Sequence, residues 1–340
     1  MHDTLAMVIS RRANRRTMLK GSAALGAATL LAGRLPLDPA SAAGKLEIFS
    51  WWTSPGEAPA LQSLFDSYTA KYPDVEIVNA AVAGGGGGPA QAVLQTRLQG
   101  KNPPDSWQTH VGRELVDQYV VPGYCEPLTS MYADQKWLDV IPQGLVDGAS
   151  YNGDQYSIPV GVHRGNDIFY NQKLMADAGV ELSENMSVDD FFKAADALKA
   201  KNIPALAMGT KDAFVAAQTF ENTLLGVVGP DSYVKLFKGE MNWDDDSVKE
   251  AMETFAKMIG YANSDRDALT WDDATHMVIE GKAGMNVMGD WAYGEVVALK
   301  AQDNIGWSNH PGTGGSFIYV VDSFTLPVGA PDHDNAENWL

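Results

Sequence analysis

Cysteine is nearly absent from this chain of 340 residues, in which Cys125 is the single example. One cysteine cannot form an intramolecular disulfide or supply a cluster of thiolate ligands to a metal. Catalysis by Cys125 would need a histidine partner that the sequence does not indicate. We therefore interpret Cys125 as a small, buried apolar side chain.

Positive charge is also scarce. The chain has 25 lysines and arginines against 43 aspartates and glutamates, and its formal net charge at pH 7 is −18. Affinity for nucleic acid depends on cations at the phosphates, and attraction to anionic membrane surfaces depends on basic clusters. We therefore expect no nucleic-acid partner and no direct membrane insertion. A neutral ligand or a cation is compatible with this composition.

Motifs for metals and nucleotides are missing. The six histidines include no close pair and no H-E-x-x-H, so we expect no metal and no cofactor. Five glycines at 84–88 lack the Lys-Ser or Lys-Thr of a phosphate loop, and Pro89 removes an amide donor. Two interpretations of this loop stay open. It is a flexible connection, or its bare backbone lets a ligand approach closely.

No apolar run is long enough to span a bilayer. Near the N-terminus, Arg15 and Arg16 open the run "RRTMLK", and a short apolar stretch and several small residues follow. This order predicts a twin-arginine signal peptide over residues 1–43, cleaved near Ala42 or Ala43. No cysteine stands at that position, so we expect no lipid anchor. The product is expected to be soluble and periplasmic.

The remaining chain alternates strand and helix patterns. We expect a strand over 45–52, an amphipathic helix over 57–73, a strand over 74–82 and a third strand near Trp107. Such alternation predicts a parallel, doubly wound sheet that binds ligands at the carboxyl ends of its strands. Helices are expected within 187–262, a helix, strand, turn and helix over 270–299, an extended stretch over 315–331 and a helix opening over 332–340.

Two adjacent tryptophans, Trp51 and Trp52, stand at the end of the first predicted strand. Neighbours in a strand point to opposite faces, so one indole is expected to anchor a core and the other to face a ligand. Most single tryptophans belong to cores. Nevertheless, Trp271 and Trp291 also stand beside short acids. An indole suits the apolar face of a sugar, and polar neighbours suit its hydroxyls, so we expect a sugar ligand.

Polar residues near these rings leave two kinds of site open. Gln108 and His110 occupy alternate positions of "SWQTH" and are expected to face one cleft. Glu57, Asp290 and Asp322 could instead act as the acid and base of a glycosidase. The distances between these carboxylates cannot be read from the sequence, so binding and hydrolysis both remain open at this point.

Six runs of the chain carry a family resemblance: "KLEIFSWW", "VNAAVAGGGG", "NPPDSWQTH", "SIPVGVHRGN", "GKAGMNVMGDWA" and "VDSFTLPVGA". Together they resemble the family 1 extracellular solute-binding proteins of sugar ABC importers, and most of all the periplasmic glucose-binding (glucose/mannose-type) proteins. The resemblance implies an α/β, two-lobed periplasmic-binding-protein fold (type II, maltose-binding-protein-like) with a ligand cleft between the lobes.

The same resemblance implies the domain organisation. Lobe 1 is expected over 44–160 with a return segment at 327–340, and lobe 2 over 161–326. The extended stretches Ile158–His163 and Ser323–Pro327 resemble the strands that cross between the lobes. Family members continue beyond the position of Leu340 with a segment that brings a lysine and a histidine to the ligand. We therefore expect the C-terminal part of the fold to be missing.

The resemblance also implies the site residues and partners. The ligand-binding residues are expected to be Trp51, Trp52, Glu57, Gly84, Gly85, Gln108, His110, His163, Trp271, Trp291 and Asp322. The implied function is capture of a monosaccharide, glucose being the expected one, by a monomer that is not an enzyme. The implied partners are the membrane permease subunits of an ABC importer. Another hexose or a disaccharide is the alternative ligand, and a secreted carbohydrate-active enzyme is the alternative class.

Overall fold

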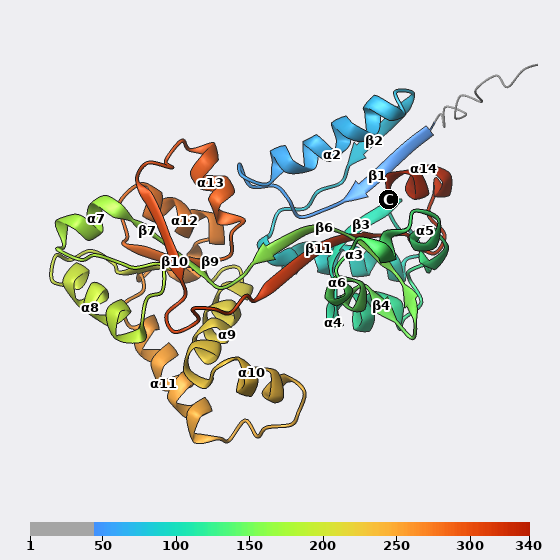
Figure 1. Ribbon diagram of the computed structural model, residues 1–340. Helices are drawn as coiled ribbons and strands as arrows, with labels where there is room; N and C mark the ends of the chain where they lie inside the picture. The colour runs from blue at the N-terminus through green and yellow to red at the C-terminus, as the bar shows by residue number, and fades with distance from the viewer. Residues whose placement is uncertain (1–43) are drawn as a thin grey trace, which may run out of the picture. The chain divides into compact units, whose positions relative to one another are not determined.

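The computed structural model describes residues 44–340, so the predicted signal peptide over 1–43 lies outside the described residues. A first, five-stranded sheet has the order β2-β1-β3-β11-β6 (Figure 1). β1 runs parallel to β2 and β3, as predicted, whereas β11 runs antiparallel to both β3 and β6. The purely parallel sheet expected from the sequence is therefore wrong for one strand, β11. The strands are β1 (Gly44–Phe49), β2 (Val75–Asn79), β3 (Ser106–His110), β6 (Ser157–Arg164) and β11 (Tyr319–Thr325).

Side chains of β1 alternate between two cores, one on each face of this sheet. Leu46 and Ile48 pack against α2, and Phe49 packs on the other face against α3. Cys125 lies buried in the α3 core, which confirms its interpretation as an apolar side chain. The surrounding elements are α2 (Ala58–Lys71), α3 (Gly88–Gln99), α4 (Arg113–Leu115), α5 (Thr129–Asp134), α6 (Gln143–Gly148), α14 (His333–Trp339) and the hairpin of β4 (Ser150–Tyr151) with β5 (Asp154–Gln155).

A second sheet of four strands has the order β10-β7-β9-β8, with one parallel pair, β8 and β9. Its strands are β7 (Asp167–Asn171), β8 (Leu206–Ala207), β9 (Met285–Met288) and β10 (Ile305–Asn309). Its helices are α7 (Gln172–Asp177), α8 (Val188–Lys199), α9 (Phe214–Val228), α10 (Pro230–Phe237), α11 (Asp246–Ile259), α12 (Trp271–Ile279) and α13 (Ala292–Ala298). In α8, Ser187 and Asp190 form a capping box, and Phe191 and Leu198 lie seven residues apart on the buried face.

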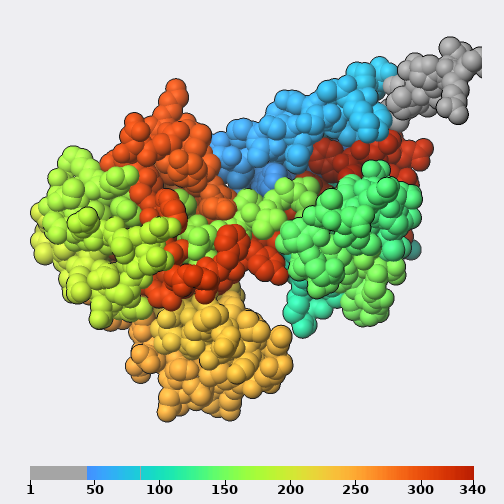
Figure 2. All heavy atoms as spheres, in the orientation of Figure 1, coloured from blue at the N-terminus to red at the C-terminus, as the bar shows by residue number. Residues whose placement is uncertain are grey.

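Two connections join the sheets. The chain passes from β6 to β7, and it returns from β10 to β11 through a segment that lies beside the yellow α9–α10 region in Figure 2. The expected division at 160/161 falls inside β6, which continues to Arg164 in the first sheet. β11 was assigned to lobe 2, yet it pairs with β3 and β6. The first sheet therefore contains the end of β6 and all of β11, which the sequence-based bounds placed in lobe 2.

Residues 44–340 contain no helix of the length and apolar character needed to cross a bilayer. Within the same residues, no group of three or more histidine, cysteine and acidic side chains is placed to hold a metal ion.

Candidate functional site

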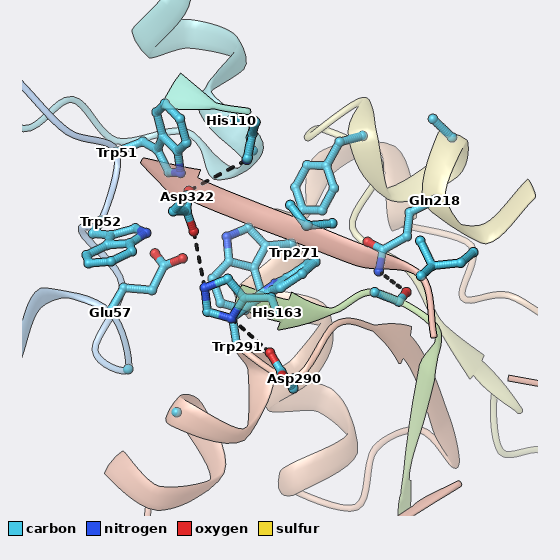
Figure 3. Close-up of a pocket in the computed structure, with 18 of the residues that line it drawn as sticks. Trp51, Trp52, Glu57, His110, His163, Gln218, Trp271, Asp290, Trp291 and Asp322 are labelled. Atoms are coloured by element: carbon cyan, nitrogen blue, oxygen red, sulfur yellow. Dashed lines mark hydrogen bonds and ion pairs between the residues drawn. The ribbon is translucent and has the colours of Figure 1, made fainter. Parts of the chain in front are cut away.

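A cavity of about 600 Å³ is lined by strands of the first sheet, by the loop before α2, and by helices and loops that pack on the second sheet. Most of the residues expected at the ligand surround it, and the labelled ones point toward its interior in Figure 3. The predicted residues that line it are Trp51, Trp52, Glu57, His110, His163, Trp271, Trp291 and Asp322. Asp290, one of the three carboxylates considered for a glycosidase, lines it as well.

Two of the described predicted residues, Gly84 and Gln108, do not line this cavity. Gly86 lines it rather than Gly84, which precedes the short 3-10 helix Gly85–Gly87. Gln108 is fully buried behind the lining. Its Oε1 accepts a 2.6 Å hydrogen bond from Ser50 Oγ, and its Nε2 donates a 2.7 Å bond to Asp322. Gln108 therefore holds a lining residue in place instead of facing the cavity.

Asp322 is the centre of the polar network. It lies on β11 directly opposite His110 of β3, and its Oδ1 is 3.7 Å from His110 Nε2. Its Oδ2 is 3.1 Å from Nε2 of His163, whose Nδ1 is 2.8 Å from Asp290. Burial alone would lower the pKa of His163. The hydrogen bonds and charges of the two aspartates outweigh that effect and raise the pKa to about 10. His163 is therefore a cation at neutral pH.

His110 is held by a second carboxylate. Its Nδ1 lies 2.8 Å from Glu114 Oε2, and its backbone amide donates to Glu114 Oε1. Burial lowers the pKa of His110, but the bond to Glu114 and the charge of Asp322 raise it overall. The ring lies against the indole of Trp51, with centroids 4.9 Å apart. Strand β3, α4 and the end of β1 thus fix the orientation of this imidazole.

Glu57 is a lining carboxylate that forms no ion pair with a basic side chain among the described residues. It stands at the N-terminal cap position of α2, and Figure 3 shows its carboxylate directed toward Asp322 and His163. Burial is the main cause that raises the pKa of Glu57 to about 7, and the charges of Asp322 and Glu295 add to it. A hydrogen bond with Ser54 opposes the rise. Glu57 therefore titrates near neutral pH when the cavity is empty.

Aromatic rings form the remaining walls. Trp51 is buried in the first sheet's core, while Trp52 is half-buried, so the two indoles differ as predicted. Trp271 begins α12, where Thr270 caps the helix. Trp291 is packed over Gly289, at which a Cβ would lie 2.0 Å from the indole. These apolar faces beside carboxylates and imidazoles can hold a neutral ligand that has flat apolar surfaces and a rim of hydroxyls.

Helix α9 contributes a group of lining residues that the sequence analysis missed. Phe214, Gln218, Glu221 and Asn222 all face the cavity. The amides of Gln218 and Asn222 donate to the carbonyl of Gly165, at 2.7 and 2.8 Å, where the chain leaves β6. Polar residues spaced three and four apart on an otherwise apolar helix were the available signal, since such residues need partners when buried.

The comparisons with known proteins agree on one family. The model of the family "Bacterial extracellular solute-binding protein" matches residues 51–340. An uncharacterized ABC transporter extracellular-binding protein, PH1214 of Pyrococcus horikoshii, is 34% identical over 299 residues, which are 87% of this chain and 67% of that protein. A probable sugar-binding periplasmic protein of Brucella suis is 32% identical over 313 residues, 89% of this chain and 72% of that protein.

Other matches are more distant, and their names differ in the sugar. The xylose/arabinose-binding protein XacG of Haloferax volcanii is 25% identical, covering 87% of this chain and 64% of that protein. The glucose-binding protein GlcS of Saccharolobus solfataricus is 22% identical, covering 83% and 54%. The bacterial solute receptor AcbH, described with a preference for β-D-galactopyranose, superposes with a TM-score of 0.75 at 21% identity, covering 87% of this chain and 75% of that one. The predicted two-lobed fold is confirmed.

Proposed function

Because the chain belongs to the bacterial extracellular solute-binding protein family, we propose that it captures a monosaccharide, glucose, and delivers it to the permease subunits of an ABC importer. In this proposal the protein is exported to the periplasm, acts as a monomer and binds without catalysis. One observation carries the proposal. The rings of Trp52, Trp271 and Trp291 line one cavity together with Glu57 and Asp322.

Each part of this lining suits one part of a pyranose ring. The indoles offer apolar surface to the C–H faces of the sugar. His110, Glu57 and Asp322 offer donors and acceptors to its hydroxyls. Because the first sheet and the helices of the second sheet both line the same cavity, a bound sugar would favour the form in which the two sides are closed around it.

The charge of the lining adds a restriction on the ligand. The described lining residues include no lysine and no arginine, whereas several carry carboxyl groups. Those carboxylates are Glu57, Glu114, Glu221, Asp290 and Asp322, against the two imidazoles of His110 and His163. Among these described residues, an anionic sugar would meet more carboxyl groups than imidazoles. We therefore propose a neutral sugar and not a sugar acid or a sugar phosphate.

A longer sugar is the second candidate ligand. The α9 side chains Gln218, Glu221 and Asn222 add polar groups to those proposed to bind one sugar ring. The cavity volume of about 600 Å³ is also larger than one monosaccharide needs. A carbohydrate-active enzyme is the alternative class, with Glu57 and Asp322 as its carboxyl pair.

Calorimetric titration against a panel of sugars tests the proposal. The panel contains glucose, galactose, mannose, xylose, maltose and glucuronate, and a parallel incubation with labelled glycosides is analysed for hydrolysis products. We expect glucose to bind most tightly, glucuronate to bind at least about tenfold more weakly and no glycoside to be cleaved. Tighter binding of maltose would replace the monosaccharide by a disaccharide. Released sugar would overturn the proposal of a binding protein.

Replacing Trp291 by alanine should weaken glucose binding by about 1 to 3 kcal/mol, because the sugar loses a desolvated aromatic surface. The measurements are the dissociation constant and the melting temperature of the same preparation. Trp243→Ala is the matched control, since that indole is exposed and packs on Phe237 away from the cavity. A lower melting temperature with an unchanged dissociation constant would show that Trp291 only supports the core.

His110→Ala should weaken glucose binding and flatten the discrimination between glucose and one monodeoxy analogue. A buried polar group that loses its hydroxyl partner costs about 1 to 3 kcal/mol, so the analogue that lacks the hydroxyl facing His110 should lose little further affinity in the variant. The measurement is a double-mutant cycle of protein variant against each monodeoxyglucose. His333→Ala is the control, because His333 pairs with Glu126 outside the cavity. An equal loss for every analogue would assign His110 a purely supporting role.

A further inference from the structure

Glu295 is a buried carboxylate that the proposed binding of sugar does not use. It lies on α13 with a fully buried side chain, and it is not among the residues that line the cavity. Its Oε2 is 2.9 Å from Nε2 of His276 on the neighbouring helix α12. Its Oε1 accepts a 2.7 Å hydrogen bond from the amide of Gly56, in the loop that enters α2. One carboxylate thus joins the helices of the second sheet to a loop of the first.

The backbones meet closely at the same place. A Cβ added to Gly56 would lie 2.6 Å from the carbonyl carbon of Gly294 and 2.7 Å from the amide nitrogen of Glu295. Gly56 and Gly294 both line the cavity, so this contact forms part of its edge. It is separate from the connecting strands β6 and β11. A contact of this kind exists only while the two sides of the cavity are together.

The hydrogen bond from the Gly56 amide to Glu295 has an ionised carboxylate as its acceptor. Burial raises the pKa of Glu295, but hydrogen bonds with His276, Ser54 and the Gly56 amide lower it overall. Hydrogen bonds to ionised groups are stronger than those between neutral groups. If the sides of the cavity separated, Glu295 would keep His276, its neighbour on α12, and would lose the amide on the far side.

We propose that Glu295 is a positioning residue that sets sugar affinity without touching the sugar, by latching the loop at Gly56 to α13 across the edge of the cavity. This inference rests on the proposed function, since it needs a ligand that both sides of the cavity enclose. A contact that is present in the closed form and absent from the open form adds its free energy to ligand binding. It acts mainly on the rate at which the ligand leaves.

The first test replaces the carboxylate. Glu295→Ala should weaken glucose binding about 10- to 100-fold, with a faster dissociation rate and an association rate that changes by less than about threefold. Glu295→Gln keeps an acceptor for the Gly56 amide, so it should recover most of the affinity. Glu280→Ala is the matched control, because that glutamate is exposed at the end of α12 and pairs with Lys282. The glucose affinity of Glu280→Ala should equal that of the wild type.

The second test introduces a steric clash at Gly56, on the other side of the contact. Gly56 does not have a left-handed backbone conformation, so an added methyl group acts through the clash with Gly294. Gly56→Ala should therefore raise the dissociation rate in the same way as Glu295→Ala. Gly88→Ala is its control, since a Cβ at Gly88 meets open space at the start of α3.

Small-angle X-ray scattering of the ligand-free proteins separates this inference from the proposed function. Glu295→Ala and Gly56→Ala should each have a larger radius of gyration than the wild type and than the two control variants, and this readout needs no sugar. Radii of gyration and dissociation rates that both equal those of the wild type would overturn the latch. Failure of the wild type to bind any sugar, with the larger radii still observed, would overturn only the proposed ligand. A lowered melting temperature with unchanged dissociation rates would make Glu295 a folding residue.

Discussion

Replacing Asp322 by alanine is expected to lower the free energy of unfolding by about 3 to 5 kcal/mol at neutral pH and to abolish sugar binding. The carboxylate is buried, accepts from Gln108 and faces the charged His163. Its removal leaves the fully buried amide of Gln108 without this acceptor and leaves His163 with one counter-ion instead of two. The first consequence is costly because the amide of Gln108 is buried, and the second because it removes one of the charges that pair with His163.

The deficit of the Asp322→Ala variant should depend on pH. A histidine whose pKa is raised from 6.5 to about 10 stabilises the fold fully below pH 6.5 and loses that contribution as the pH rises through 10. Loss of Asp322 lowers the pKa of His163, so the deficit should be largest near pH 6.5 and should shrink toward pH 10. Urea unfolding at pH 6.5 and 9.5 measures it.

Asp303→Ala is the control for this experiment, because Asp303 is exposed in the turn before β10. Its unfolding free energy should match that of the wild type at both pH values. A deficit of the Asp322→Ala variant that stays constant with pH would show that the charge of His163 is not what Asp322 stabilises. No deficit at all would contradict the whole carboxylate–imidazole network.

The edge of the sheet at which the predicted residues gather could be predicted from the sequence, because it follows from local rules. Alternating strands and helices place the ends of β1 and β3 at one edge of a sheet, and this brings Trp51, Trp52 and His110 together. β1 ends at Phe49, earlier than expected, so the tryptophans lie in the segment that follows the strand. The local rule located these residues although it misjudged where the strand stops.

The same local rules could not predict how deeply each side chain is buried. Alternation along β3 correctly puts Gln108 and His110 on one face, and both side chains do reach toward Asp322. Whether such a side chain faces the cavity or lies behind its wall depends on β11, which pairs Phe324 with Gln108 and Asp322 with His110. That register joins residues more than 200 positions apart, and no spacing near Gln108 reports on it.

The contribution of α9 illustrates a second limit. Its polar residues look like the exposed face of an ordinary amphipathic helix in the sequence, and the family resemblance did not point to them. They meet the cavity because Gly165, between β6 and β7, accepts hydrogen bonds from Gln218 and Asn222. The spacing of these residues indicates that they need partners, but the site that they reach depends on how the helix packs on distant elements.

Glu57→Gln is expected to make the ligand-free protein more stable and a weaker binder. The pKa of Glu57 is raised from 4.5 to about 7, mainly by burial, so the ionised form is disfavoured in the fold. A carboxyl group with a raised pKa lowers stability progressively as the pH rises from 4.5 to 7, and the difference then stays constant. Glutamine cannot ionise, so the Glu57→Gln variant keeps its stability as the pH rises. Above pH 7 the variant should be more stable by about 2 to 3 kcal/mol.

At pH 5 the same comparison should give less than about 1 kcal/mol, because Glu57 is then protonated in the folded protein. Chemical denaturation at pH 5 and pH 8 measures both values, and Glu76→Gln is the control, since Glu76 is exposed on β2 and pairs with Lys45. Equal differences at the two pH values would show that ionisation of Glu57 is not their cause.

Binding should change in the opposite direction. An ionised Glu57 is a stronger acceptor for a sugar hydroxyl than an amide oxygen, so the variant should bind glucose about 1 kcal/mol more weakly at pH 8. Hydroxyl donors also lower the pKa of Glu57, so the wild type should release protons when it binds sugar near pH 7. Titration in buffers of different ionisation enthalpy detects that release, which Glu57→Gln should abolish. If the variant gains stability and keeps its full affinity and proton release, Glu57 does not contact the sugar. A loss of affinity coupled to the gain in stability would mean that this carboxyl group is held at the cavity for binding, at the expense of the ligand-free fold.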